Sequence, residues 1–243
     1  MGISPARVTA VVLGAMFLLL TWFLYKGDFW SLDTEAQREA AIVEYASANP
    51  EDTSGLRAVL NPEVVFDETI QDRRILVFTD REIEGLLGNI QFRRGIAGGW
   101  QPLSASYSAG AVMQRTALTG VDVRVVYAAD CPPEVVHYLV APVEDQPETV
   151  MAEGDVSGSA FFHIYETDRD FFPSIYLYDA RGNLLDSQYY LATDQSVPSP
   201  SIGSAETNLV YWFCALVLGV GYLIVKYLWD LGTHTAKKEE TVP

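Results

Sequence analysis

The side chains best able to do chemistry in this chain are its histidines, and two of the three lie in its main body. His137 occurs in VVHYLV and His163 in FFHIY, and both segments are typical of β-strands. Two histidines with a nearby carboxylate are a plausible zinc or iron site. No H-x-H, HExxH or CxxC motif supports one, so we predict no metal ligand and no cofactor.

Motifs of other enzyme classes are equally absent from the sequence. GDVSGSA places Ser157 before Gly158 but lacks the strand–turn–helix setting of a nucleophilic serine. GIAGGW has no Walker lysine, and ETDRD at 166–170 lacks the glycine and distal glutamate of a calcium loop. Carboxylates are so numerous that no pair stands out as acid and base. We therefore predict no catalytic residue.

Two neighbouring segments suggest ligand binding by aromatic side chains instead. In SAFFHIY one strand face carries Phe161, His163 and Tyr165, and in SIYLY one face carries Tyr176 and Tyr178. If these strands pair through TDRDFFP, the five side chains form a patch suited to a peptide, a glycan or a partner protein. The favoured alternative is that both faces are covered, because a sheet that carries a helix buries both.

The elements that must position these residues point to a mainly β domain. Thr34 and Gln37 fit a capping box, and apolar residues at helical spacing predict an amphipathic helix at about 34–48. Segments such as VDVRVVY alternate in polarity, and turn signals separate them. We expect an α+β, mainly β domain at 26–195, built as an antiparallel sheet or sandwich with one N-terminal helix.

Long apolar runs flank this domain. Residues 8–25 are 18 uncharged residues without an A-x-A-like cleavage site, which indicates an uncleaved signal anchor. Residues 209–225 are 17 more, and the apolar character continues to 229, enough to span ~30 Å as a helix. We expect transmembrane helices at 8–25 and 208–229, the second after a Pro/Ser linker at 196–207.

The basic residues near these spans predict the topology. One lysine, Lys26, lies beside the spans on the domain side, whereas the terminal pieces carry four basic residues: Arg7, Lys226, Lys237 and Lys238. The positive-inside rule then places residues 1–7 and 230–243 in the cytoplasm and 26–208 outside, across a plasma membrane that we take to be bacterial.

Small residues recur four apart in both spans. Ala10 and Gly14 form one such pair, and Ala215 and Gly219 form the other. Pairs of this kind let helix backbones approach closely, so we predict that these four residues pack on the other span or on a partner. The alternative is that small residues are simply common in membrane helices.

Charge and cysteine content limit the classes of function. The chain carries a net charge of −16, and all of the excess acid lies between the spans. Such a domain does not bind nucleic acid through its phosphates. Cys131 lies in the domain and Cys214 in the second span, so the two cannot form a disulfide across these locations.

Three functions remain open after this reading. The first is a non-enzymatic binding or accessory module, held in the lipid bilayer and serving another membrane or envelope protein. The second is a membrane-tethered hydrolase or metal-dependent enzyme that uses His137 or His163. The third is a structural envelope component whose acidic surface orders cations or cell-wall polymers.

Overall fold

The computed structural model describes residues 5–46, 61–110, 112–142, 150–166, 173–188 and 204–239 of the 243-residue chain. The chain divides into two compact units. One contains the two long terminal helices, and the other, Ser31–Ile202, contains the β-strands. The expected fold class, α+β and mainly β with antiparallel strands between two long apolar helices, is confirmed.

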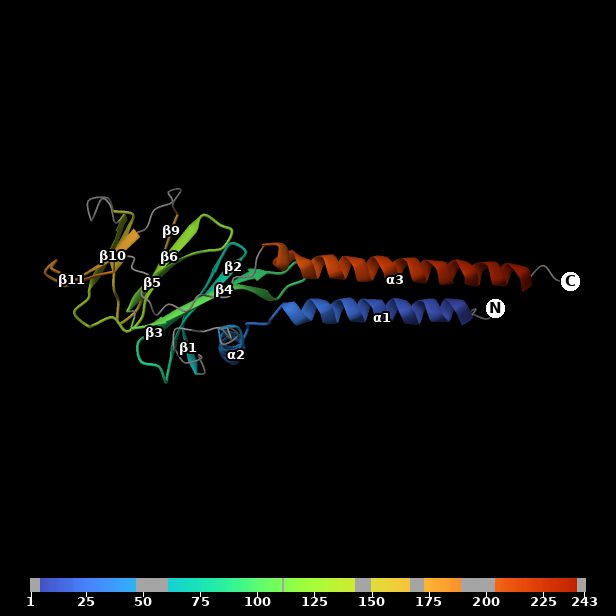
Figure 1. Ribbon diagram of the computed structural model, residues 1–243, viewed down its shortest axis with the longest axis horizontal. Coiled ribbons are helices and arrows are strands. Elements are labelled where there is room, and N and C mark those ends of the chain that lie inside the picture. Colours follow the sequence, from blue (N-terminus) through green and yellow to red (C-terminus); the bar gives the residue numbers. More distant parts are fainter. Residues whose placement is uncertain are drawn as a thin grey trace. The chain divides into compact units, whose positions relative to one another are not determined.

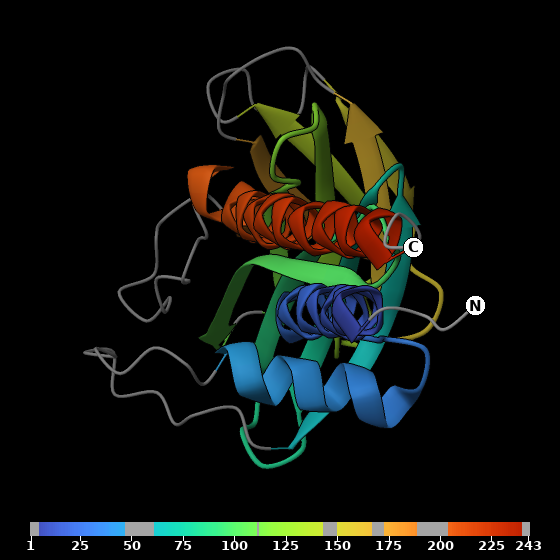
Figure 2. The same cartoon turned by 90° about the vertical axis from the view of Figure 1, so that its right-hand side faces the viewer.

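The helical unit is an antiparallel pair of α1 (Pro5–Asp28) and α3 (Ser204–Glu239). Figure 1 shows the two helices side by side, and Figure 2 looks nearly along their axes. Near the start of α1 the guanidinium of Arg7 lies 5.3 Å from the ring centroid of Trp229. Near its end, Tyr25 and Phe29 are buried with Val210 of α3. These contacts at opposite ends fix the antiparallel arrangement.

Both helices are long and apolar enough to cross a membrane, over Pro5–Asp28 and Asn208–Thr233. Only 11% of each apolar window is buried, so their large side chains point outward, among them Leu18, Phe23, Trp212 and Leu223. A core helix of a soluble protein would bury such residues.

The helices are longer than the predicted spans. α3 begins at Ser204, inside the segment 196–207 expected to be a linker, because neither Pro nor Gly follows Gly203 until Gly219. It also continues to Glu239, through residues expected to form a separate tail. Residues 196–203 lie outside the described part of the chain.

The first sheet is a four-stranded antiparallel meander. Its strands are neighbours in space in the order in which they occur in the chain: β1 (Pro62–Ile70), β2 (Arg73–Asp80), β3 (Leu86–Arg94) and β4 (Trp100–Ala109). Gly88 in β3 has its backbone against aromatic neighbours, and a Cβ there would lie 2.5 Å from the ring of Phe78 and 2.7 Å from Cβ of Tyr107. Glycine is required at this position by packing rather than by a turn.

Two further antiparallel sheets follow. The second has the order β5-β6-β9, and its strands are β5 (Met113–Ala117), β6 (Val123–Ala128) and β9 (Phe161–Glu166). The third has the order β11-β10-β7-β8, and its strands are β7 (His137–Pro142), β8 (Ala152–Asp155), β10 (Pro173–Tyr178) and β11 (Leu184–Gln188).

The second sheet lies between the other two, and β6 is buried on both faces. Val125 and Tyr127 pack with Ile75 and its neighbours of the first sheet. Val126 and Ala128 pack on the other side with residues of the third sheet. The alternation of VDVRVVY predicts one inward and one outward face, whereas the structure covers both, because a third layer packs against the side that carries Val126.

The polar face of β3 is also buried. Asn89 and Gln91 are each 2% exposed and point toward the second sheet. The amide of Asn89 donates to the hydroxyl of Tyr127 at 2.8 Å, and that hydroxyl donates to Oε1 of Gln114 at 2.9 Å. The amide of Gln91 donates to Oγ1 of Thr116 at 2.9 Å. The polar residues are tolerated because the facing sheet supplies their hydrogen-bond partners.

Helix α2 (Glu35–Ala46) corresponds to the amphipathic helix expected at about 34–48, and it lies against β1 and β4. Its first turn has the reciprocal capping box: Oγ1 of Thr34 accepts from the Gln37 amide at 3.3 Å, and Oε1 of Gln37 accepts from the Thr34 amide at 3.0 Å. Beside it, Arg74 of β2 makes a two-point pair with Asp67, 2.7 Å for each bond, and Nη2 also donates to the carbonyl of Leu32 at 3.1 Å.

Candidate functional site

The aromatic residues expected to form one binding patch belong to two different sheets. β9 pairs with β6, and β10 pairs with β7 and β11, so the pairing that a single aromatic patch would require is not formed. Phe161 and Tyr165 are buried in the core between the second and third sheets. Tyr176 is 3% exposed and Tyr178 is half-buried. Both lie on the face of β10 that points away from this core, opposite Ile175 and Leu177. The connecting residues 167–172 lie outside the described part.

His163, the fifth of these residues, contacts Tyr138 in the core between the second and third sheets. The hydroxyl of Tyr138 is hydrogen-bonded to Nδ1 of His163. The Tyr138 ring also stacks on Phe161, with centroids 4.1 Å apart and planes 4° from parallel. A Cβ on Gly154 would lie 2.6 Å from the Tyr138 hydroxyl oxygen, so β8 closes the other side. Burial, and secondarily the charge of Asp155, raises the pKa of Tyr138.

His137 lies next to Tyr138 in β7 but points to the other face of the third sheet. Its Nδ1 is 3.1 Å from Oδ1 of Asp155, the residue opposite it in β8. The two histidines thus lie on opposite sides of β7 and do not share a site. No group of three or more histidine, cysteine or acidic side chains among the described residues is arranged to hold a metal ion. Within the described ranges, His137 and His163 therefore do not combine into one metal-binding site.

The helical unit separates the four small residues expected to mediate helix packing. Ala10 is buried, and a Cβ on Gly14 would contact the Val225 side chain at 3.6 Å, so both face α3. Ala215 and Gly219 are exposed, and a Cβ on Gly219 would have nothing within 4 Å. The close approach on α3 occurs instead at Gly221, where a Cβ would lie 2.6 Å from the Phe17 ring.

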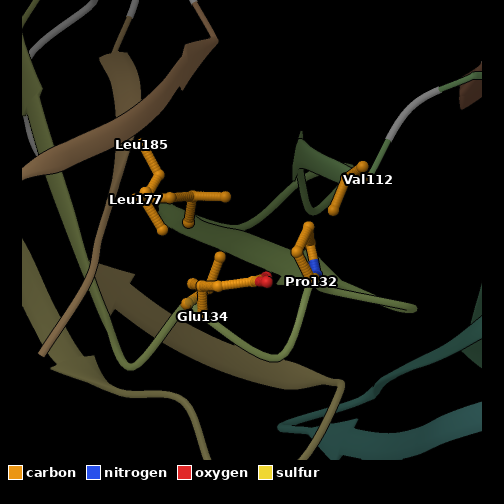
Figure 3. Close-up of a pocket in the computed structure, with 6 residues that line it drawn as sticks. Val112, Pro132, Glu134, Leu177 and Leu185 are labelled. Carbon is orange, nitrogen blue, oxygen red and sulfur yellow. The ribbon is translucent and has the colours of Figure 1, made fainter.

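A pocket of about 330 Å³ opens where the core between the second and third sheets reaches the surface. Figure 3 shows Leu177 and Leu185 facing Val112 across it, with Pro132 and Glu134 along one side. Val135 completes the lining. Leu177 and Val135 belong to the core, whereas Pro132, Glu134 and Leu185 are exposed at the rim. The pocket therefore has an apolar floor and one carboxylate at its mouth.

The loop that carries Pro132 and Glu134 is tied down along its length. Asp130 adopts a left-handed conformation, with φ 53°, and the Cys131 amide then donates to the carbonyl of Ser159 at 2.7 Å. The Val135 amide closes the turn onto the Pro132 carbonyl at 3.0 Å, and the Val136 amide donates to Tyr178 at 3.0 Å. The pyrrolidine rings of Pro132 and Pro133 also fix the φ angles of these two residues. This wall is consequently formed before any ligand binds.

Cys131 belongs to the same loop and packs into the core beneath it. Its side chain is buried in the core between the second and third sheets, and burial, reinforced by the charge of Asp130, raises the pKa of its thiol from 9.0 to about 11. A buried thiol with a raised pKa is a poor nucleophile and a poor metal ligand. Its contribution is therefore packing beneath the pocket.

The opposite wall owes its shape to a β-bulge. β10 and β11 pair Leu177 with Asp186 and Tyr178 with Leu184, so Leu185 is an extra residue on the edge strand. A bulge re-aims the side chains beside it, and bulges are common next to functional sites. Here the Leu185 side chain lines the pocket beside Leu177 while remaining 45% exposed.

Sequence reasoning does not find this pocket. Its six lining residues come from four separate segments, and none belongs to a recognisable motif. The one local signal is the Cys-Pro-Pro turn at 131–133. Its two prolines predict a rigid turn, but the sequence does not predict which residues pack against it. The bulge at Leu185 depends on strand register, which the sequence of β11 leaves open.

Comparison of the chain with protein-family models, with curated proteins and with solved structures finds no match. The architecture of the described residues is therefore the only description of its class: a β-rich unit with three antiparallel sheets, in a chain with a long apolar helix on either side of it in the sequence.

Proposed function

We propose that this chain is a two-span integral membrane protein whose β-rich domain is a binding or accessory module for another membrane or envelope protein. The observation that carries the proposal is the outward-facing apolar surface of the α1–α3 pair. In the most apolar 18-residue stretch of each helix, only 11% of the residues are buried. In water such a surface would drive association, whereas in a bilayer it is the surface that lipid or a partner helix requires.

The ends of the pair fit the same setting. Trp22 has Lys26 over its ring at 5.1 Å, and Trp229 has Arg7 at 5.3 Å, which places amphipathic and basic groups together where headgroups would lie. Antiparallel helices put both chain ends on one side. Together with the basic residues of the terminal pieces, this supports cytoplasmic termini and an external β-rich domain at a plasma membrane.

A binding role rather than a catalytic one is favoured by the side chains of the domain. Among the described residues no group of three or more histidine, cysteine or acidic side chains is arranged to hold a metal ion, and the pocket at Leu185 is lined by five apolar residues and one carboxylate. Acidic surfaces with a preformed apolar pocket are suited to recognition.

Two measurements test the proposal in sequence. Membranes from cells that express the full chain are washed with alkaline carbonate, and the protein is expected to stay with the lipid pellet. A membrane-impermeant protease is then added to intact cells, where it should digest the β-rich domain. Release by carbonate contradicts the membrane spans, and protection in intact cells with digestion after lysis contradicts the external location.

The binding role has its own test. The tagged full chain is purified in a mild detergent after chemical cross-linking in cells, and its partners are identified by mass spectrometry. A stoichiometric membrane or envelope protein supports the proposal. Recovery of the chain alone, with or without cross-linker, contradicts an accessory role.

A further inference from the structure

The pocket between Leu177, Leu185 and Val112 has a shape that limits what can occupy it. Three of its six lining residues, Pro132, Glu134 and Leu185, are exposed at the rim, so an occupant remains partly in water. Free small ligands are usually held in sites that cover most of their surface. A volume of about 330 Å³ at an open rim suits instead one or two side chains that belong to a larger molecule.

The lining limits the chemistry of the occupant. The floor and opposite walls are aliphatic, with Val112, Val135 and Leu177 and no aromatic ring, which favours a branched aliphatic group over a flat one. Glu134 supplies the one charged group of the lining, at the mouth. An aliphatic group buried beside it, with a cation just outside, satisfies both features.

The charge of the chain and the rigidity of the loop fit the same occupant. The chain as a whole carries a net charge of −16, which attracts basic partners at long range and repels acidic ones. The loop wall is held by backbone hydrogen bonds from Cys131, Val135 and Val136, so little conformational entropy is lost on binding.

We propose that this pocket is the docking site for a segment of a partner protein in which an aliphatic residue is followed by lysine or arginine. The aliphatic side chain enters between Leu177, Leu185 and Val112, and the cation lies against Glu134. This inference rests on the proposed binding function and names the surface and the partner chemistry through which that function acts.

The test uses the full chain in detergent micelles and a fluorescent peptide, acetyl-Gly-Ser-Leu-Lys-Leu-Ser-Gly-amide, with binding followed by fluorescence anisotropy. Saturable binding is expected for this peptide. Replacing its lysine by glutamate, or both leucines by alanine, is expected to weaken binding at least about tenfold, because the charge match or the buried group is lost. Equal binding of all three peptides overturns the proposal.

Two variants and a matched control locate the site. Leu185→Ser is expected to weaken peptide binding about tenfold, and Glu134→Gln about threefold with a weaker dependence on salt. Leu184→Ser alters a neighbour of similar exposure, 51% against 45%, that does not line the pocket, and it is expected to leave binding nearly unchanged. Both leucines are half exposed, so both variants should fold. Loss of binding in Leu184→Ser but not in Leu185→Ser overturns the assignment.

Two further outcomes separate this inference from its alternatives. If n-pentylamine competes with the peptide at an equal concentration, the occupant is a small amine and the peptide proposal is overturned. If a partner cross-links in cells equally well to wild type and Leu185→Ser, the binding function stands but this pocket is not its site. If peptide binding holds while the protein is released by carbonate, the membrane assignment fails and the pocket inference stands.

Discussion

Gly221 of α3 lies against the ring of Phe17 in α1 so closely that a Cβ there would come within 2.6 Å of the ring. Gly219, two residues earlier on the same helix, has open space where its Cβ would be. Two glycines that look alike in the sequence therefore have different surroundings, and they form a matched pair for experiment.

Gly221→Leu is expected to force α1 and α3 apart, because Phe17 and its backbone must move to admit the side chain. The full chain in detergent should melt at a lower temperature than wild type. Gly219→Leu is the control and should melt like wild type, since nothing lies within 4 Å. Equal destabilisation by the two changes would contradict the described helix pairing.

Asp67→Asn is expected to lower the free energy of unfolding by about 2 kcal/mol, because it removes a two-point pair with Arg74 and leaves that part-buried guanidinium facing Arg38. The comparison variant is Arg81→Gln, which breaks more exposed pairs with Glu39 and Glu63. Exposed pairs contribute about 0–1 kcal/mol each. Chemical denaturation of the full chain in detergent measures both, and a larger loss in Arg81→Gln would refute this ranking.

Tyr138→Phe is expected to cost about 1 kcal/mol of stability, because the hydrogen bond to Nδ1 of His163 is lost while the stacking on Phe161 is kept. Tyr138→Ala should cost about 3 to 5 kcal/mol, since the stacked ring is lost from the core as well. Chemical denaturation of the full chain in detergent measures both free energies. A cost as large for phenylalanine as for alanine would mean that the ring contributes nothing.

Cys131 gives the domain a dependence on alkaline pH. Its folded pKa of about 11 lies above the ordinary value of 9.0, so at a pH between these values the unfolded chain loses a proton that the folded chain retains. Unfolding then becomes easier as the pH rises. The contribution of the protonated thiol to the free energy of unfolding is fully present below pH 9 and is lost as the pH rises toward 11. Subtracting the stability of Cys131→Ala from that of wild type at each pH should give a difference that falls between pH 9 and 11. A flat difference would show that the thiol titrates normally in the folded protein.

The same thiol should react slowly in the folded state. In a Cys214→Ser background, Ellman's reagent at pH 8 is expected to label Cys131 at a rate set by opening of the core, and to label it at once in denaturant. A thiol that reacts equally fast with and without denaturant would place Cys131 at the surface.

The sequence alone determined those features that depend on one stretch of chain. The apolar runs are visible without a fold because a membrane span needs only length and the absence of charge. The capping box of α2 lies within four consecutive residues, and Gln37 and Thr34 bond as their spacing predicts. The mainly β class follows from alternation and turn residues, which are equally local.

Only the tertiary structure decided which strands are neighbours. His163 and Tyr176 lie thirteen residues apart and look like facing strands of one hairpin, yet β9 pairs with β6 and β10 with β7. The burial of Asn89 and the outward position of Gly219 likewise depend on which layer or helix covers each face. Alternation assigns residues to the two faces of a strand, but the partner of each face is chosen by packing among distant segments. The pocket at Leu185 exists only once that choice is made.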